Sequence, residues 1–343
     1  METLYVAADI AKQSFTSAYW SEKQAKYWQA YANEPTGYEA FAQQVQAAQS
    51  ASGAEQVHLI LEPTGGYELG LALFAYEQGW LVTKPNPKDL RAWATGMGYR
   101  AKNDKIDAMM LAEYGGRNEP DPQELVPQAV RELDYYLRRL DELKRDRQAE
   151  RNRLDTAKQK PDTPRPLLDN IERSLERLQE QMAEIEAAIA TLLKRSPELR
   201  NQRRLLLSVP GIGAKNSLPI LVLCYRFHAL TCGKGTKKQL AAFLGVDSQT
   251  YVSGTSVRGS VAISKRGSRM GRAFLYMGAL GGIRGHNVLR LFYQQMLARG
   301  KAKKVALVAC SRKILTWAWA VFTSASPFDP TRFSHLESSP SLP

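Results

Sequence analysis

The chain has 343 residues, 44% of them hydrophobic, so it is long enough for two or three domains and apolar enough to exclude wholesale disorder. Its three widely spaced cysteines exclude a disulfide scaffold and a cysteine-cluster zinc site, and they favour a reducing, cytoplasmic compartment. The net charge of +13 predicts an anionic partner, and we expect neither a leader segment nor a membrane-spanning run.

Residues 1–125 are predicted to form an α/β domain. Short apolar runs bounded by polar residues are typical of strands, and longer stretches with helical periodicity lie between and after them. Several strands followed by alternating helices and strands indicate a mixed sheet with helices packed against it. The expected strands are 4–8, 15–20, 27–31, 58–61 and 81–84, and the expected helices are 35–48, 68–78, 88–94 and 105–114.

Four acids of this domain lie where a site is expected. Asp9 and Glu62 each follow an apolar run, and the crevice of an open α/β sheet lies beyond its strand ends. Asp104 and Asp107, spaced i, i+3, share one face of the last predicted helix. Four converging carboxylates repel one another, so a hard divalent cation such as Mg²⁺ or Mn²⁺ is the natural counter-charge. Each acid could instead be a solvated end, and Asp104 could cap a helix that starts at Lys105.

Residues 126–200 are predicted to be helical and highly charged. Apolar residues spaced alternately three and four apart form a continuous seam, and a second apolar row precedes three prolines at 161, 164 and 166. The pattern predicts either a helical hairpin packed on its own domain or a coiled-coil arm that pairs protomers, and the regular period favours the pairing arm. The seam consists of Leu168, Ile171, Leu175, Leu178, Met182, Ile185, Ile189 and Leu192.

Residues 201–335 are predicted to form a basic domain, followed by a disordered tail at 336–343. The charges are unevenly spread, because residues 201–343 carry 21 Lys/Arg against 3 Asp/Glu, whereas residues 1–120 carry 10 against 14. Such an imbalance favours a nucleic-acid partner over a basic surface kept for solubility or one attracted to anionic lipid. Near the start of this domain, Pro210-Gly211-Ile212-Gly213 and then Lys215 predict a turn between two helices. Its N–H groups could contact phosphate, or the glycines could serve the turn alone.

A second motif of the basic domain combines hydroxyls, glycines and cations. It reads Ser253-Gly254-Thr255-Ser256-Val257-Arg258-Gly259, with Lys265 and Arg266 a few residues further on. A loop of this kind suits phosphate binding, with Arg258, Lys265 and Arg266 neutralising the charge. It also suits a serine nucleophile that attacks phosphorus beside an arginine. Composition alone favours the plain phosphate-binding loop.

Several of these motifs, taken in order, resemble one family of bacterial insertion-sequence transposases, the bridge-RNA-guided recombinases, which are related to pilin-gene invertases. The three segments around Asp9, Glu62 and Asp104–Asp107 resemble the family's DEDD motif, residues 209–213 resemble the opening of its second domain, and residues 253–259 resemble its serine motif. The resemblance runs from about Tyr5 to Arg332 and includes Pro327-Phe328-Asp329 near the end. The segments are Ala8-Asp9-Ile10-Ala11-Lys12, Leu61-Glu62-Pro63-Thr64-Gly65 and Asn103-Asp104-Lys105-Ile106-Asp107-Ala108.

The resemblance implies an RNase H-like (RuvC-like) domain at 1–125, a dimerising coiled coil at 126–200 and a mostly α-helical transposase domain at 201–335. It implies that Asp9, Glu62, Asp104 and Asp107 hold Mg²⁺, and that Ser253 joins a DNA end covalently in a site shared between protomers. The implied partners are donor and target double-stranded DNA, a structured bridge RNA that pairs with both, and further copies of the chain, as a dimer that assembles to a tetramer. The implied location is the bacterial cytoplasm, with the nucleoid.

Two other functions remain open on the residues alone. The first is a metal-dependent endonuclease of the Holliday-junction type, in which water attacks and no covalent step occurs. The second is a non-catalytic architectural protein that binds nucleic acid and whose acids are structural. Within the serine motif, where Ser253, Thr255 and Ser256 all carry hydroxyls, we prefer Ser253 because Gly254 leaves its hydroxyl unobstructed, whereas the β-branched Thr255 is stiffer and its oxygen more crowded.

Overall fold

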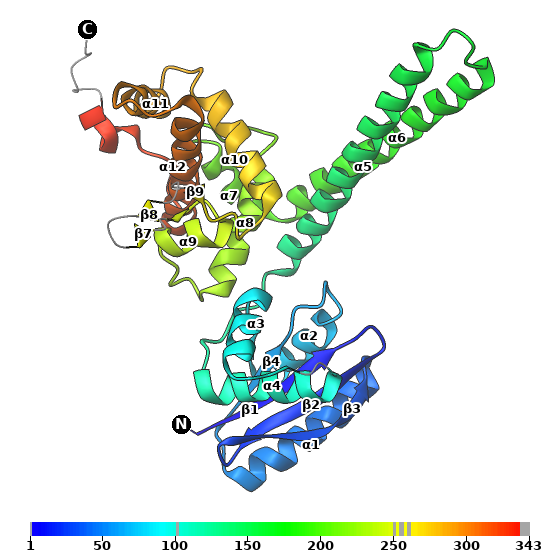
Figure 1. Ribbon diagram of the computed structural model, residues 1–343, viewed down its shortest axis with the longest axis vertical. Helices are drawn as coiled ribbons and strands as arrows, with labels where there is room; N and C mark the ends of the chain where they lie inside the picture. Colours follow the sequence, from blue (N-terminus) through cyan, green and yellow to red (C-terminus); the bar gives the residue numbers. More distant parts are fainter. Residues whose placement is uncertain (1, 101–102, 250–251, 254–256, 259–261, 337–343) are drawn as a thin grey trace. The chain divides into compact units, whose positions relative to one another are not determined.

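The computed structural model describes residues 2–100, 103–249, 252–253, 257–258 and 262–336 (Figure 1). The chain divides into two compact units. The first contains Met1–Leu125 together with the short segment Ala229–Cys232, and the second contains Val126–His228 and Gly233–Pro343. Each unit has its own hydrophobic core, so each is described separately below.

The first unit is built on a five-stranded mixed sheet in the order β3-β2-β1-β4-β5. The first three strands pair antiparallel, while β1 pairs parallel with β4, and β4 pairs parallel with β5. The mixed sheet expected from the sequence is therefore confirmed. The strands are β1 (Thr3–Ile10), β2 (Ser14–Ser21), β3 (Gln24–Ala32), β4 (Gln56–Leu61) and β5 (Leu81–Thr83).

Both faces of this sheet are covered by helices. Alternate side chains of the central strand, such as Val6 and Ala8, share a buried cluster with residues of α1 and α2. The intervening residue Ala7 and its neighbour Ile60 share another cluster with residues of α3 and α4. Burial on both faces explains why β1 and β4 are nearly continuous apolar runs. The helices are α1 (Pro35–Ser52), α2 (Leu69–Glu77), α3 (Pro87–Gly96) and α4 (Asp104–Asn118).

In the second unit, α5 (Gln128–Lys158) and α6 (Arg165–Arg195) form an antiparallel hairpin (Figure 1). Each helix has 31 residues, or about 46 Å at 1.5 Å per residue. The predicted seam on α6 faces α5 of the same chain, where Ile171 and Met182 are buried. Within the chain the hairpin alternative is therefore the arrangement adopted, and the expectation that this region also pairs protomers stays a prediction.

The rest of the second unit is a helical body around α12. By length and composition this helix is sufficient to cross a membrane, whereas the sequence pattern predicts no membrane-spanning run. However, 61% of its most apolar window is buried, and Cys310 and Ile314 lie in the core of the unit, so α12 serves as a core helix. The helices are α7 (Pro197–Leu206), α8 (Ser217–Leu230), α9 (Lys237–Leu244), α10 (Arg269–Gly282), α11 (Val288–Ala298), α12 (Lys303–Ser324) and the 3₁₀ segment η1 (Pro330–Leu336).

Within the first unit, His58 is a buried residue with a satisfied ring. Its Nε2 lies 2.8 Å from the hydroxyl of Thr83, and that hydroxyl donates to the Asp121 carbonyl at 2.8 Å. Because the Thr83 proton is used in this way, Nε2 of His58 must be the protonated nitrogen. Burial lowers the pKa of His58 to about 4, so the ring is neutral near pH 7.

The titration of His58 predicts an acid-sensitive fold. Its pKa lies near 6.5 in the unfolded chain and about 4 in the folded chain, so protons bind the unfolded chain preferentially between these values. Stability should therefore fall by about 2 to 3 kcal/mol between pH 7 and pH 4.5 on account of this residue. His58→Gln keeps an N–H donor and does not titrate, so urea unfolding of this variant should show a loss smaller by that amount. Equal losses in both proteins would contradict the assignment.

Candidate active site

Asp9 and Glu62 lie side by side on the face of the sheet that α4 covers. The parallel register pairs Ala8 with Leu61, so the next residue on each strand is one of the two acids. Side chains alternate along a strand, so Asp9 lies on the same face of the sheet as Ala7, which packs with residues of α4. The sequence placed Asp9 after the strand, whereas it lies within β1 because it also pairs with Thr16 of β2. Both acids are partly buried.

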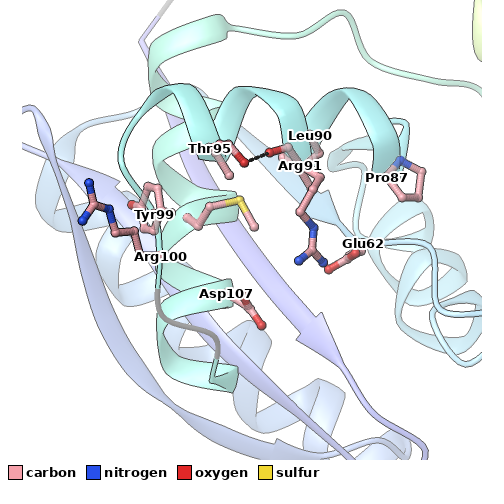
Figure 2. Close-up of a pocket in the computed structure, with 10 residues that line it drawn as sticks. Glu62, Pro87, Leu90, Arg91, Thr95, Tyr99, Arg100 and Asp107 are labelled. Atoms are coloured by element: carbon pink, nitrogen blue, oxygen red, sulfur yellow. Dashed lines mark hydrogen bonds between the residues drawn. The ribbon is translucent and has the colours of Figure 1, made fainter.

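Asp107 reaches the same region from the first turn of α4. The side chain of Asn103 caps this helix by accepting from the Ile106 N–H at 2.8 Å, so the alternative that Asp104 is the cap is wrong. Asp107 is partly buried and lines a cavity together with Glu62 (Figure 2). Asp104 is exposed and does not line that cavity. The structure thus places Glu62 beside Asp9 in the strand register and beside Asp107 in one cavity, whereas Asp104 is exposed one turn away.

Close packing fixes α4 on the sheet. A Cβ on Gly115 would lie 2.8 Å from Ile60 Cγ1, and one on Gly116 would lie 2.1 Å from the Trp20 ring, so only glycine allows this approach. Arg117 lies over the Trp20 ring at 5.4 Å, and Lys105 lies over the Tyr27 ring at 4.9 Å, near the two ends of the helix. These contacts hold the helix that carries Asp104 and Asp107 in place against the strands.

The cavity beside these acids also contains arginines. It has a volume of about 70 Å³, and its wall includes Arg91 of α3 and Arg100 in addition to Glu62 and Asp107. Figure 2 shows the Arg91 side chain extending toward Glu62, whereas Arg100 points away from both acids. The sequence reasoning missed Arg91. A sequence signal was present, because Arg91 directly follows Leu90 on α3. Leu90 packs in the core, so the neighbouring arginine is anchored close to the sheet.

The donor chemistry of this region fits a hard divalent cation, because Glu62 and Asp107 line one cavity and Asp9 lies next to Glu62 in the strand register. Within the described ranges no three acidic, histidine or cysteine side chains are yet close enough together to hold a metal ion. Arg91 extends toward Glu62 and supplies positive charge there. The side chains would need to draw together around a cation, and carboxylate rotamers allow such movement.

The serine motif lies in a nested pair of short β-hairpins between α9 and α10. The outer pair joins β6 (Ser248–Gln249) to β9 (Ala262–Ile263), and the inner pair joins β7 (Val252–Ser253) to β8 (Val257–Arg258). In the inner pair Ser253 is opposite Val257. Gly254, Thr255, Ser256 and Gly259 lie outside the described residues.

The base of these hairpins is tightly packed. A Cβ on Gly245 would lie 2.6 Å from the Arg266 nitrogen, and one on Gly267 would lie 2.0 Å from the Phe243 carbonyl oxygen. Lys265 has a φ of +55°, and its N–H donates to the Gly245 carbonyl at 3.1 Å. The backbone at this base is therefore fixed, and it presents the exposed side chains of Lys265 and Arg266 beside the serine motif.

The Pro-Gly-x-Gly turn packs against the core of the second unit. Gly211 has a φ of +90°, and a Cβ there would lie 2.6 Å from Ile314 Cδ1 of α12. The Gly213 N–H donates to Asn216 Oδ1 at 2.7 Å, and Asn216 Nδ2 donates to the Gly211 carbonyl at 2.9 Å. The turn therefore packs on the core and pairs these polar groups within the chain, which favours the alternative that the glycines serve the turn, and the phosphate contact stays a prediction. Lys215 remains exposed.

Comparison with known proteins agrees with these features. A transposase family model for the DEDD domain of IS110 elements matches residues 6–157, and a model described as "Transposase IS116/IS110/IS902 family" matches residues 203–294. Together the two matches cover more than half of the chain.

Three relatives extend the comparison. The chain is 29% identical over 340 residues to a pilin gene-inverting protein of Moraxella bovis, covering 96% of this chain and 98% of the relative. The pilin gene-inverting protein of Moraxella lacunata matches equally, at 29% over 340 residues. An "Insertion element IS110 uncharacterized 43.6 kDa protein" of Streptomyces coelicolor is 26% identical over 167 residues, which cover 48% of this chain and 38% of that protein.

The packing of the Pro-Gly-x-Gly turn gives a prediction. Gly211→Ala should destabilise the second unit by about 2 to 3 kcal/mol, because the new methyl group meets Ile314 and the positive φ is strained. Gly213→Ala is the matched control, since nothing lies within 4 Å of its Cβ position, and it should change stability little. Thermal unfolding checks both variants. If Gly211→Ala kept full stability and lost DNA affinity, the phosphate-binding role would be supported.

Proposed function

The chain belongs to the IS110 family of transposases and is a DNA recombinase, and from this premise we propose that it exchanges DNA strands through a covalent phosphoserine intermediate. The observation that carries the proposal is that Glu62 lies next to Asp9 in the strand register and shares a cavity with Asp107. The strand order, with three antiparallel strands followed by two parallel ones, supports an RNase H-like (RuvC-like) reading of the first unit.

In the proposed site, Asp9, Glu62 and Asp107 would hold a divalent cation, Mg²⁺ or Mn²⁺, with Asp104 joining from the first turn of α4. A bound cation would neutralise the carboxylates and stabilise negative charge on the scissile phosphate. Arg91 extends toward Glu62, so it is placed to contact a phosphate oxygen once the cation takes over the acids. These groups orient DNA and offset its charge.

The chemistry we propose for Ser253 conserves the phosphodiester bond energy. Its Oγ attacks phosphorus and gives up its proton to a base or to water, while the bond from phosphorus to the 3′ oxygen breaks and that oxygen takes up a proton. A 3′ hydroxyl of the other duplex then attacks the phosphoserine, which forms the new phosphodiester and releases Ser253. Arg258, Lys265 and Arg266 supply positive charge beside the reacting phosphate.

We further propose that a structured bridge RNA pairs with donor and target DNA. Support comes from the resemblance of the motifs and from the basic residues of 201–343, which suit the backbones of several nucleic-acid strands at once. The relatives named for pilin gene inversion support two-site recombination, since inverting a segment requires cutting and rejoining at both of its ends. A dimer assembling to a tetramer, in the bacterial cytoplasm with the nucleoid, completes the proposal.

The carboxylates give the first test of this function. Asp9→Asn, Glu62→Gln and Asp107→Asn should each lower DNA cleavage by about a hundredfold or more, because stabilising the transition-state charge is worth several kcal/mol. Asp104→Asn should do the same if its side chain turns inward on metal binding. Glu77→Gln, an exposed acid at the end of α2, is the matched control. Cleavage of donor DNA is measured with RNA transcribed from the element's flank, and full activity in excess chelator would contradict the metal role.

The nucleophile gives the second test. Ser253→Ala should eliminate the covalent protein–DNA adduct, whereas Thr255→Ala and Ser256→Ala should only reduce it. The adduct is trapped, trimmed with nuclease and located by mass spectrometry. A nucleotide on Thr255 or Ser256 would move the nucleophile within the motif. Nicked product without any adduct would favour the Holliday-junction type of endonuclease, and binding without cleavage would favour an architectural protein.

A further inference from the structure

Asn33 joins the two loops that lead away from the acid-bearing strands. It lies between β3 and α1, and its side-chain Nδ2 donates to the Ala11 carbonyl at 3.1 Å and to the Tyr67 carbonyl at 3.2 Å. Ala11 follows β1, two residues after Asp9, and Tyr67 lies in the loop after β4, five residues after Glu62. One amide group therefore bridges the chain segments that follow both acids.

The backbone of Asn33 adds to this bridge. Its N–H donates to the Gln13 carbonyl at 2.9 Å, within the turn between β1 and β2. The register between β1 and β4 ends at Ala8 and Leu61, so Glu62 lies beyond the last paired residues of these strands. Beyond that point the side chain of Asn33 supplies two hydrogen bonds that link the two segments. They act where the sheet itself no longer sets the spacing.

Tyr38 of α1 orients the Asn33 amide. Its hydroxyl donates to Asn33 Oδ1 at 2.6 Å, so the amide oxygen is occupied and both amide hydrogens are directed at the carbonyls. The Tyr38 ring is buried near Phe74, with a centroid separation of 5.8 Å. A Cβ on Gly70 would lie 2.5 Å from the Tyr38 hydroxyl oxygen, so glycine at the start of α2 leaves room for this contact.

The loop that Asn33 holds is itself closed by Glu68. Its carboxylate accepts from the Gly66 N–H at 2.9 Å and from the Thr64 N–H at 3.2 Å. Burial opposes ionisation of Glu68, but these backbone donors and the charge of Lys84 keep its pKa below the usual value. The loop from Pro63 to Glu68 is thus closed by its own hydrogen bonds. The hydrogen bond from Asn33 to Tyr67 therefore restrains the position of Glu62 through a short, internally bonded segment.

We propose that Asn33 is a positioning residue that keeps Asp9 and Glu62 side by side, so that both can turn toward one divalent cation. The inference rests on the proposed function, because it assumes that these two acids bind a cation. Asn33 touches neither the acids nor the DNA in this role. It restrains the loops that carry them, and groups that orient metal ligands in this way commonly change metal affinity about 10- to 100-fold when removed.

Mn²⁺ binding to the full chain tests the proposal. Electron paramagnetic resonance measures free Mn²⁺ during titration, and Asn33→Ala should weaken binding about tenfold or more. Tyr38→Phe should weaken it in the same direction and by less, since the amide remains but loses its orienting partner. Tyr31→Phe is the matched control: it removes a comparable tyrosine hydrogen bond, to Gln44 Oε1 at 3.0 Å in the same unit, and should leave the affinity within twofold of wild type.

DNA cleavage supplies a second readout that a merely structural role would not move. Raising Mn²⁺ should restore the cleavage rate of Asn33→Ala toward that of wild type, whereas Asp9→Asn should stay inactive at every concentration. Asn33→Ala with wild-type affinity would overturn the proposal, whether or not its melting temperature falls. Should Asn33→Ala fail to fold, an unchanged affinity in Tyr38→Phe would overturn it instead. If wild type and Asp9→Asn bind Mn²⁺ equally, or neither binds it, the proposed metal site is contradicted, which is a different outcome from a failure of the role of Asn33.

Discussion

The parallel pairing of β1 with β4 is the constraint on which the rest of the site depends. Side chains alternate along each strand, so a shift of register by one residue would move Asp9 or Glu62 to the opposite face, among the side chains that pack on α1 and α2. The observed register sends both acids to the face that α4 covers, and the glycines of α4 let that helix approach closely enough for Asp107 to join them.

Electrostatics then explains why this arrangement suits a bound cation. Acids that face one space repel one another, and the first unit tolerates them only with positive charge nearby. Arg91 extends toward Glu62, and a cation could take over that role when DNA is bound. The second unit supplies the complementary property. Its basic residues attract phosphate, and the tight base of the β-hairpins holds Lys265 and Arg266 next to the serine motif. In the proposed function, the first unit would bind the metal and the second unit would bind phosphate.

The sequence was informative where a local pattern determines the structure. Burial on both faces made β1 and β4 readable as apolar runs, and strand ends identified Asp9 and Glu62. It was less informative where tertiary packing decides between alternatives. The seam on α6 has the same period whether it faces a partner or α5, and the glycines at 211 and 213 could serve phosphate or packing equally well. Arg91 and Asn33 were missed because their partners are distant in the sequence, and contacts with loops and acids leave no periodic signal.

The resemblance implies a site shared between protomers, and we propose on that basis that the carboxylates and the serine act in one reaction from different copies of the chain. Mixing two inactive variants tests it most directly: Asp9→Asn retains the serine, and Ser253→Ala retains the carboxylates. With DNA and guide RNA, the account predicts that the mixture recombines DNA although neither variant does so alone, and that the covalent adduct forms only on the Asp9→Asn chain, which is distinguished by a mass tag. A mixture as inactive as its components would contradict the account.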